Sequence, residues 1–186
     1  SPRKKYNETY ERMHNPEVDY IDRSVGRLID HLRASGKLEN TVVLFVSDHG
    51  EEFLEHGRFK HGITLYEEVI RVPLIVYDGR IERDGIQIQE VTSNLDIMPT
   101  LLSLAGETPP SGALGRVLPG FADNDTGERL VYSELPRPVL QDGMEPEDYD
   151  LYWKAVVDGR YKLITGEDVE SGEQIWSRFH DLAEDP

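Results

Sequence analysis

The stretch Thr41-Val-Val-Leu-Phe-Val-Ser47-Asp48-His49-Gly50-Glu51 decides the fold of this chain. Its first residues are apolar or β-branched and carry no charge before Asp48, a pattern typical of a strand covered on both faces, as in a parallel sheet. The strand then stops at an acid, an imidazole and a glycine. Because ligands of open α/β sheets bind just outside the carboxyl ends of strands, we predict a ligand site at the end of strand 41–47.

Asp48 and His49 are the first candidate metal ligands. A carboxylate offers a hard oxygen and an imidazole offers a borderline nitrogen to a divalent cation. Calcium prefers oxygen ligands, so His49 by itself favours zinc or manganese. The alternative is a strand that ends in a polar turn, in which Gly50 supplies a positive φ.

The composition excludes some classes of function. The chain has 186 residues, enough for a substantial core, and a formal charge of −16 from 20 basic and 36 acidic side chains. Nucleic acid is not an expected partner, because binding it needs a basic face. No apolar run reaches transmembrane length. The chain has no cysteine, which excludes disulfides and a thiol nucleophile within it.

The pattern along the chain predicts an α/β fold. A helix is expected to begin at Pro16 with Asn15 as its cap and to end at Gly36. After strand 41–47, further strands are expected at 73–77 and 87–92, and a helix at 94–105. The predicted fold is part of a mostly parallel sheet flanked by helices, followed by a small antiparallel C-terminal subdomain.

Three regions are predicted within the chain: an α/β domain over 1–106, a linker over 107–128 and the antiparallel subdomain over 129–186. Proline and glycine mark the linker. The acidic segment 141–150 is predicted to be a mobile loop. The candidate strands of the subdomain are 130–134, 153–157, 161–165 and 175–180, with Asp158-Gly159 as a hairpin turn.

Several motifs in the same order resemble the C-terminal half of the sulfatases, members of the alkaline phosphatase superfamily. They are Ser47-Asp48-His49-Gly50-Glu51, Leu65-Tyr66-Glu67-Glu68, Arg71-Val72-Pro73-Leu74, Asp96-Ile97-Met98-Pro99-Thr100-Leu101, Asp158-Gly159-Arg160-Tyr161-Lys162-Leu163-Ile164 and His180-Asp181-Leu182. The resemblance covers nearly the whole chain.

The resemblance implies roles for four residues. Asp48 and His49 would complete a metal site that is otherwise built from acids in the N-terminal half of the protein. Calcium is expected there from the sulfatases, and zinc or manganese from the phosphatase-type relatives. Lys60 and His61 compete for the role of the basic residue that touches the anionic group or protonates the leaving oxygen. His61-Gly62 also resembles the His-Gly of two-metal relatives, in which the histidine is a ligand.

The resemblance also implies that parts of the enzyme lie outside this chain. Family members carry an Asp pair and a Cys- or Ser-x-Pro-x-Arg segment whose Cys or Ser becomes a formylglycine nucleophile, and neither pattern is present here. The expected function is therefore that of a C-terminal fragment of a sulfatase-type, metal-dependent hydrolase of sulfate esters. Its expected partners are a sulfated or phosphorylated small molecule or glycan and the missing N-terminal half of the same protein.

Two alternatives remain at this point. One is a phosphodiesterase, phosphonate hydrolase or phosphoethanolamine transferase of the same superfamily. The other is a non-catalytic acidic binding module that uses Asp48 and His49 only as a structural metal clip. The neighbouring Glu51, Glu55 and His56 are expected to be solvated loop residues, and the alternative is that they orient a ligand of the site.

Overall fold

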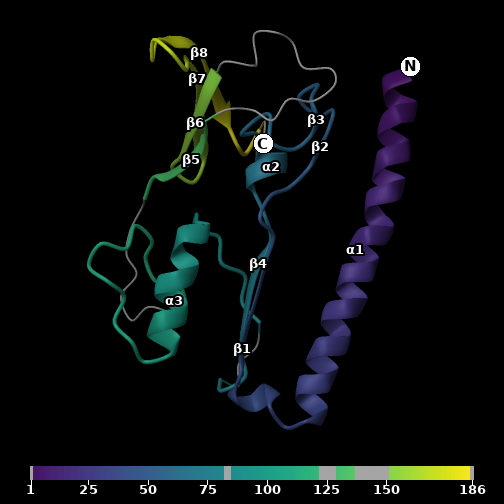
Figure 1. Ribbon diagram of the computed structural model, residues 1–186, viewed down its shortest axis with the longest axis vertical. Coiled ribbons are helices and arrows are strands. Elements are labelled where there is room, and N and C mark those ends of the chain that lie inside the picture. Colours follow the sequence, from purple (N-terminus) through teal and green to yellow (C-terminus); the bar gives the residue numbers. More distant parts are fainter. Residues whose placement is uncertain (1, 82–84, 122–128, 137–150, 185–186) are drawn as a thin grey trace. The chain divides into compact units, whose positions relative to one another are not determined.

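The computed structural model describes residues 2–81, 85–121, 129–136 and 151–184, and for residues 2–11 and 13 it describes the backbone only. The chain forms two compact units, Ser1–Asp84 and Gly85–Pro186 (Figure 1). The elements of the first unit are helix α1 (Pro2–Ala34), 3₁₀ helix η1 (Leu38–Asn40), strands β1 (Val42–Val46), β2 (Glu52–Phe53) and β3 (Phe59–Lys60), helix α2 (Glu67–Ile70) and strand β4 (Leu74–Asp78).

Helix α1 is longer than the sequence pattern predicts. It runs through Pro16, so the prediction of a helix start at this residue is wrong. The proline removes only one backbone hydrogen bond of this 33-residue helix, so the sequence signal at Pro16 does not fix where the helix begins. The predicted end is confirmed, since Gly36 has a φ of 66° and the Lys37 N–H donates to the Leu32 carbonyl at 2.9 Å.

Strand β1 confirms the predicted strand at the start of the deciding stretch. It pairs with β4 in antiparallel register, from Val42 opposite Asp78 to Val46 opposite Leu74. Every strand pair in the described residues is antiparallel. The parallel neighbours predicted for strand 41–47 are not among them.

Gly50 holds the loop after β1 against helix α2. Its N–H donates to the Val69 carbonyl at 2.7 Å. A Cβ atom at this position would lie 2.0 Å from the Glu68 carbonyl oxygen, so only glycine fits without moving the backbone. The role predicted from a positive φ is wrong, because Gly50 is not among the glycines with positive φ; close backbone approach requires this residue instead.

The first regular elements of the second unit are two consecutive helices. They are 3₁₀ helix η2 (Asn94–Asp96) and helix α3 (Ile97–Leu104), which confirm the predicted helix at 94–105. Residues 87–92 form no strand, and that prediction is wrong.

Asp96 is 1% exposed and accepts hydrogen bonds from Ser93 N–H, from Arg116 N–H and from the Arg129 guanidinium at 2.6 and 2.9 Å. Burial by itself raises the pKa of Asp96, but these partners outweigh it and lower the pKa below the usual range.

The antiparallel C-terminal sheet is confirmed. Its strands follow the order β5-β6-β7-β8. Their bounds are β5 Val131–Leu135, β6 Leu151–Val157, β7 Tyr161–Asp168 and β8 Gln174–Asp181. The hairpin at Asp158-Gly159 is also confirmed, with a φ of 104° at Gly159 and a hydrogen bond from Asp158 N–H to the Tyr161 carbonyl. The acidic segment 141–150 and the linker residues 122–128 lie outside the described residues.

Glu52 is a buried acid in the first unit. Its side chain is fully buried on β2, and neither carboxyl oxygen has a well-formed hydrogen bond. Burial raises the pKa of Glu52 from 4.5 to about 8, and the nearby Thr64 hydroxyl, itself buried, offsets only part of that effect. The neighbouring charges are those of Glu68, Arg58 and Glu55. The side chain is therefore a neutral acid at neutral pH.

Glu52 should make the protein less stable as the pH rises. The folded state holds a proton that the unfolded state releases, so stability falls between pH 4.5 and about 8 and changes little above that range. In Glu52→Gln the side chain cannot ionise, and this fall should be reduced by several kcal/mol, since one pKa unit corresponds to about 1.4 kcal/mol. Urea unfolding from pH 5 to pH 9 measures the effect, with Glu107→Gln, an exposed acid of the second unit, as the control. Parallel pH profiles of wild type and Glu52→Gln would contradict it.

Candidate functional site

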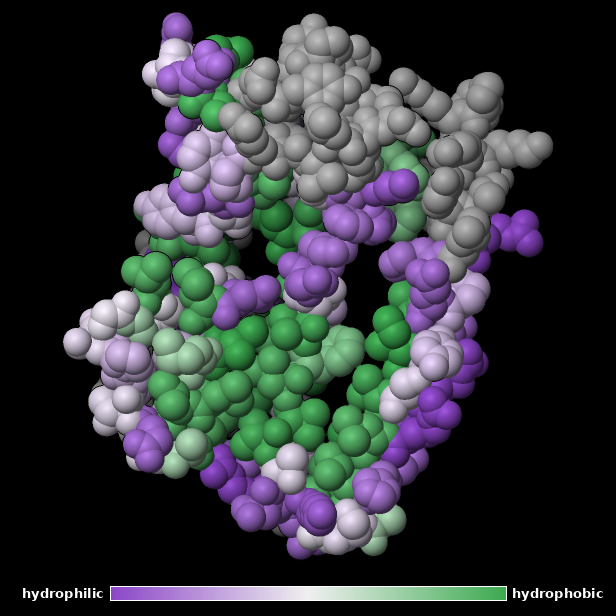
Figure 2. Space-filling view, in the orientation of Figure 1, coloured by the Kyte–Doolittle hydropathy of each residue, from purple (hydrophilic) through white to green (hydrophobic). Residues whose placement is uncertain are grey.

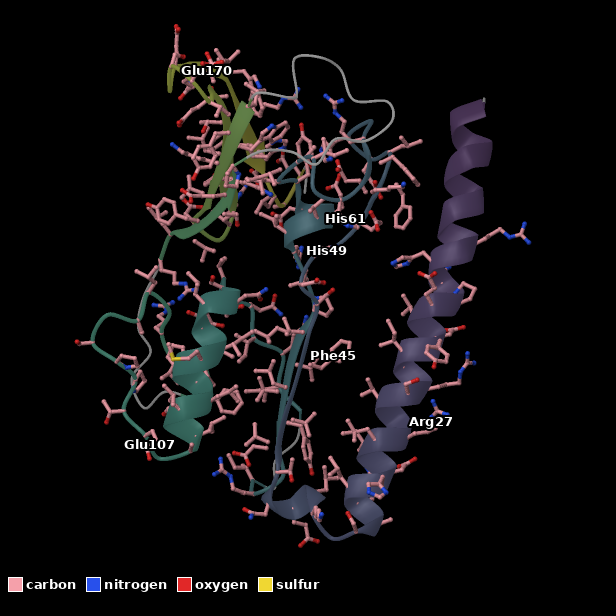
Figure 3. The ribbon with its side chains drawn as sticks, viewed as in Figure 1. Arg27, Phe45, His49, His61, Glu107 and Glu170 are labelled. Carbon is pink, nitrogen blue, oxygen red and sulfur yellow. The ribbon has the colours of Figure 1, made fainter. Side chains whose placement is uncertain are left out.

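The site lies at the carboxyl end of β1, where Figure 3 shows His49 with His61 nearby. The Ser47 hydroxyl donates to the His49 carbonyl at 2.7 Å, and the His49 N–H donates to Asp48 Oδ1 at 3.1 Å. These local bonds shape a turn whose side chains face outward. The Asp48 side chain is 90% exposed and that of His49 is 42% exposed, so both are accessible to a ligand.

The hydrogen bonds of His49 determine which ring nitrogen faces a ligand. Its Nδ1 lies 2.9 Å from the Gly50 carbonyl oxygen. A carbonyl only accepts, so Nδ1 carries the proton in this bond and Nε2 keeps its lone pair in the neutral ring. Nε2 lies 3.8 Å from Asp48 Oδ1. One nitrogen donor and one oxygen donor thus stand next to each other, as two ligands of one cation would.

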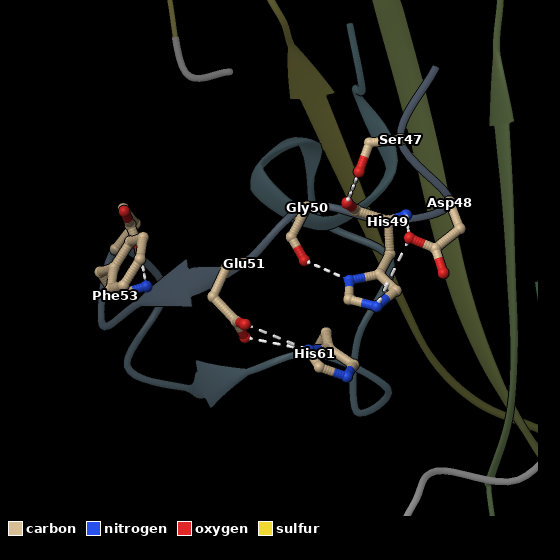
Figure 4. A network of polar contacts seen from close by, with 8 residues as sticks. Ser47, Asp48, His49, Gly50, Glu51, Phe53 and His61 are labelled. Atoms are coloured by element: carbon tan, nitrogen blue, oxygen red, sulfur yellow. Dashed lines mark hydrogen bonds and ion pairs between the residues drawn. The ribbon is translucent and has the colours of Figure 1, made fainter. Parts of the chain in front are cut away.

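His61 directly follows strand β3 of the β2–β3 hairpin and contacts His49. Its ring stacks on the His49 ring with centroids 3.7 Å apart and an angle of 26° between the planes. Its Nδ1 lies 3.1 and 3.2 Å from the two carboxylate oxygens of Glu51 (Figure 4). Lys60 precedes it as an exposed residue with a φ of 71°. The structure therefore stacks His61 on His49, which in turn lies next to Asp48.

Glu51 and His56 are not the solvated residues that the sequence predicts. Glu51 is 25% exposed and pairs with His61, whereas His56 is 20% exposed and its Nδ1 lies 2.7 Å from Glu68 Oε1. The His56 ring also stacks on Tyr66 at 3.9 Å with nearly parallel planes. The predictions failed because a charged loop sequence gives no sign of the partners that partly bury its side chains in the fold, which are His61 for Glu51 and Glu68 and Tyr66 for His56. Only their position beside Asp48 and His49 pointed to a role.

Helix α2 and the residue before it hold the hairpin loop next to the site, through the contacts of Glu68 and Tyr66 with His56. Tyr66 is 2% exposed and precedes α2, while Glu68 lies on that helix. The backbone of the same helix accepts the Gly50 hydrogen bond. Helix α2 thus holds both the loop with Asp48 and His49 and the hairpin loop with His56.

The donor set at this site fits a divalent metal in part. A carboxylate and an imidazole Nε2 are suitable ligands, but no group of three or more His, Cys, Asp or Glu residues that could hold a metal is found within the described part of the chain. The described residues contain no helix that is both long and apolar enough to cross a bilayer.

Comparison with known proteins places the chain among the sulfatases. The sequence model of the Sulfatase family matches residues 12–107, just over half of the chain. An arylsulfatase from Clostridium perfringens is 38% identical over 122 residues, which are 63% of this chain and 25% of that protein. The multifunctional alkaline phosphatase superfamily protein PehA from Trinickia caryophylli is 35% identical over 156 residues, 79% of this chain and 30% of that protein.

A solved structure gives the same answer for the fold. The neighbour, a protein whose structure is in complex with its substrate D-glucosamine-2-N,6-O-disulfate, is 26% identical to this chain with a TM-score of 0.66, and the match covers 91% of this chain and 33% of the neighbour. The chain thus spans about a quarter to a third of the length of these relatives. With the family match and the α/β fold in agreement, the chain belongs to the sulfatase family.

Proposed function

We propose that the protein containing this chain is a metal-dependent hydrolase of sulfate esters, and that this chain supplies two metal ligands and one residue acting on the ester. The observation that carries the proposal is the stacking of His61 on His49, whose Nε2 lies 3.8 Å from Asp48 Oδ1, just after β1. The Asp48 and His49 side chains are accessible there. The relatives named above support a sulfated substrate.

Asp48 and His49 would hold the metal. Calcium follows from the family resemblance, and zinc or manganese would suit the His49 nitrogen better. When bound, the metal would polarise an oxygen of the ester and stabilise the charge that develops there. The remaining ligands and the nucleophile, a formylglycine in the family, would come from sequence outside this chain.

His61 and Lys60 would act on the ester itself. A neutral imidazole whose Nδ1 carries the proton presents Nε2 to a ligand, and a protonated ring can donate a proton from that atom to the leaving oxygen. Lys60, which is exposed and adjacent, would contribute positive charge toward the anionic group. In a chain with a net charge of −16, such local positive groups are needed to meet an anionic substrate.

The uncovered apolar surface of the first unit supports the proposed missing half. Ile75 is 60% exposed and Tyr77 is 45% exposed on β4, and Val18, Ile21 and Leu28 on α1 are about half exposed. Figure 2 shows hydrophobic residues gathered over the β1–β4 pair. We propose that further strands and helices of the same protein cover these faces and give β1 its predicted parallel neighbours.

A phosphoryl-transfer enzyme of the same superfamily is the second candidate. It is favoured by the similarity to PehA and by His61-Gly62, which resembles a metal-ligand motif of two-metal relatives. The stacked rings of His49 and His61 would then both face metal ions. The two candidates differ in the ester that they hydrolyse.

The intact protein should hydrolyse an aryl sulfate or a sulfated glucosamine faster than an aryl phosphate or an aryl phosphonate. Its kcat/KM for the best sulfate ester should exceed that for the matched phosphorus ester by at least about 100-fold. The four substrates should be compared with calcium, zinc and manganese in turn. A preference for the aryl phosphate or the aryl phosphonate would replace this proposal with the second candidate. No turnover of any of the four esters would leave the non-catalytic binding module as the function.

Asp48→Asn should weaken metal binding by the intact protein. The change keeps the shape of the side chain but removes its charge, and even indirect supporting residues of metal sites contribute about 10- to 100-fold in affinity. We expect a loss of more than about 100-fold, measured by calorimetry on metal-free protein. Asp30→Asn, an exposed acid on α1, is the control. Unchanged affinity in Asp48→Asn would remove the ligand assignment.

His61→Ala should reduce turnover by about 10²- to 10⁴-fold, the range for loss of a group that transfers protons. Lys60→Ala should reduce it by less than about tenfold, because this residue would contribute charge but no proton transfer. Steady-state kinetics at saturating metal separates a defect in chemistry from loss of a ligand. If the lysine variant is the more damaged, the two roles are exchanged.

A further inference from the structure

Glu51 makes a contact that the proposed function does not use. Its two carboxylate oxygens lie 3.1 and 3.2 Å from His61 Nδ1. An ionised carboxylate only accepts hydrogen bonds, so His61 carries a proton on Nδ1 in this arrangement. The contact therefore selects one tautomer of the neutral ring and directs Nε2 toward any ligand.

A second contact restrains the same ring from its face. His49 stacks on His61 at 3.7 Å, and His49 is itself held through Nδ1 by the Gly50 carbonyl. Figure 4 shows the three side chains of Glu51, His49 and His61 in this arrangement. The carboxylate limits rotation within the ring plane, and the stacked ring limits tilting. Together they specify where His61 Nε2 points.

The contact between Glu51 and His61 adds little to the stability of the fold. Exposed or half-exposed ion pairs contribute only about 0 to 1 kcal/mol. Glu51 also adds negative charge to a strongly acidic chain, in a loop that already contains the exposed Glu55. Glu55 shows the ordinary use of such an acid, since it is exposed and its carboxylate accepts the Phe53 N–H at 2.5 Å. Glu51 instead reaches a side chain of the site.

We propose that Glu51 is a positioning residue that holds the Nδ1–H side of His61, so that Nε2 faces the sulfate ester and, when the ring is protonated, carries the proton that passes to the leaving oxygen. This inference rests on the proposed function, because it assigns Glu51 through His61. Glu51 touches neither substrate nor metal in this role. Its effect on the reaction passes entirely through the histidine ring.

The test uses the intact protein at saturating metal. Glu51→Ala should lower kcat by about 10- to 100-fold, the range for residues that orient a site's ligands, and should change KM by less than about threefold. Glu51→Gln keeps an oxygen that accepts from Nδ1 and should recover most of the loss. Glu55→Ala, which removes an acid from the same loop, should stay within about twofold of wild type.

A double-mutant cycle separates positioning from general damage. If Glu51 acts only through His61, the double variant Glu51→Ala/His61→Ala should be no slower than His61→Ala alone. Losses that multiply would overturn the proposal, as would a Glu51→Ala variant with wild-type kcat. Equal losses in Glu51→Ala and Glu55→Ala would also overturn it, because they would mean that the loop is merely disturbed.

A second measurement does not depend on turnover. Nitrogen NMR shifts of the His61 ring should report a proton on Nδ1 in the wild type and a mixture of tautomers in Glu51→Ala. Unchanged ring shifts in the variant would overturn the positioning role even in an active enzyme. The expected shifts in a protein that hydrolyses no sulfate ester would leave the geometry correct and the proposed function wrong.

Discussion

The close approach of Gly50 to helix α2 is the constraint on which the site depends. The loop after β1 can lie against this helix because residue 50 has no side chain, and the hydrogen bond from its N–H to Val69 holds it there. The same helix carries Glu68, which binds His56 in the β2–β3 loop. One short helix thus places two loops, and through them Asp48, His49 and His61.

Two buried acids show how differently a fold can accommodate a carboxyl group. Asp96 is surrounded by donors and a guanidinium, so it stays ionised and links the start of α3 to the segment at Arg116 and to Arg129. Glu52 lacks such partners, and its burial favours the neutral form. The first acid stabilises the second unit of the chain. The second opposes stability as the pH rises and lies one residue after Glu51.

The net negative charge of the chain opposes the binding of an anionic ester at the proposed site. A net charge of −16 repels an anionic ester at long range, although salt screens this effect beyond roughly 10 Å. In the proposed enzyme, attraction would come from a metal ion at Asp48 and His49 and from Lys60 and His61 beside them. The acids that surround the site are occupied, with Glu51 on His61 and Glu68 on His56.

Much of the fold was readable from the sequence because it depends on local patterns. The apolar run before Asp48 predicted β1, alternation and Asp158-Gly159 predicted the C-terminal hairpin, and the family motifs predicted a sulfatase. Local patterns also misled: helix α1 passes through Pro16, and residues 87–92 form no strand, since such signals are weak against the packing around them.

Only the tertiary structure decided the arrangement of the site. The sequence by itself determined that Asp48 and His49 end a strand and that a basic residue follows in the same loop. It did not determine that His61 stacks on His49, that Glu51 holds His61, or that a buried Glu52 is neutral. These contacts depend on the β2–β3 hairpin, which turns back at residues 54–58, and on Gly50 meeting α2, and no periodic pattern encodes such distances. The physical reason is that side-chain orientation and burial are set by neighbours that are remote in the sequence.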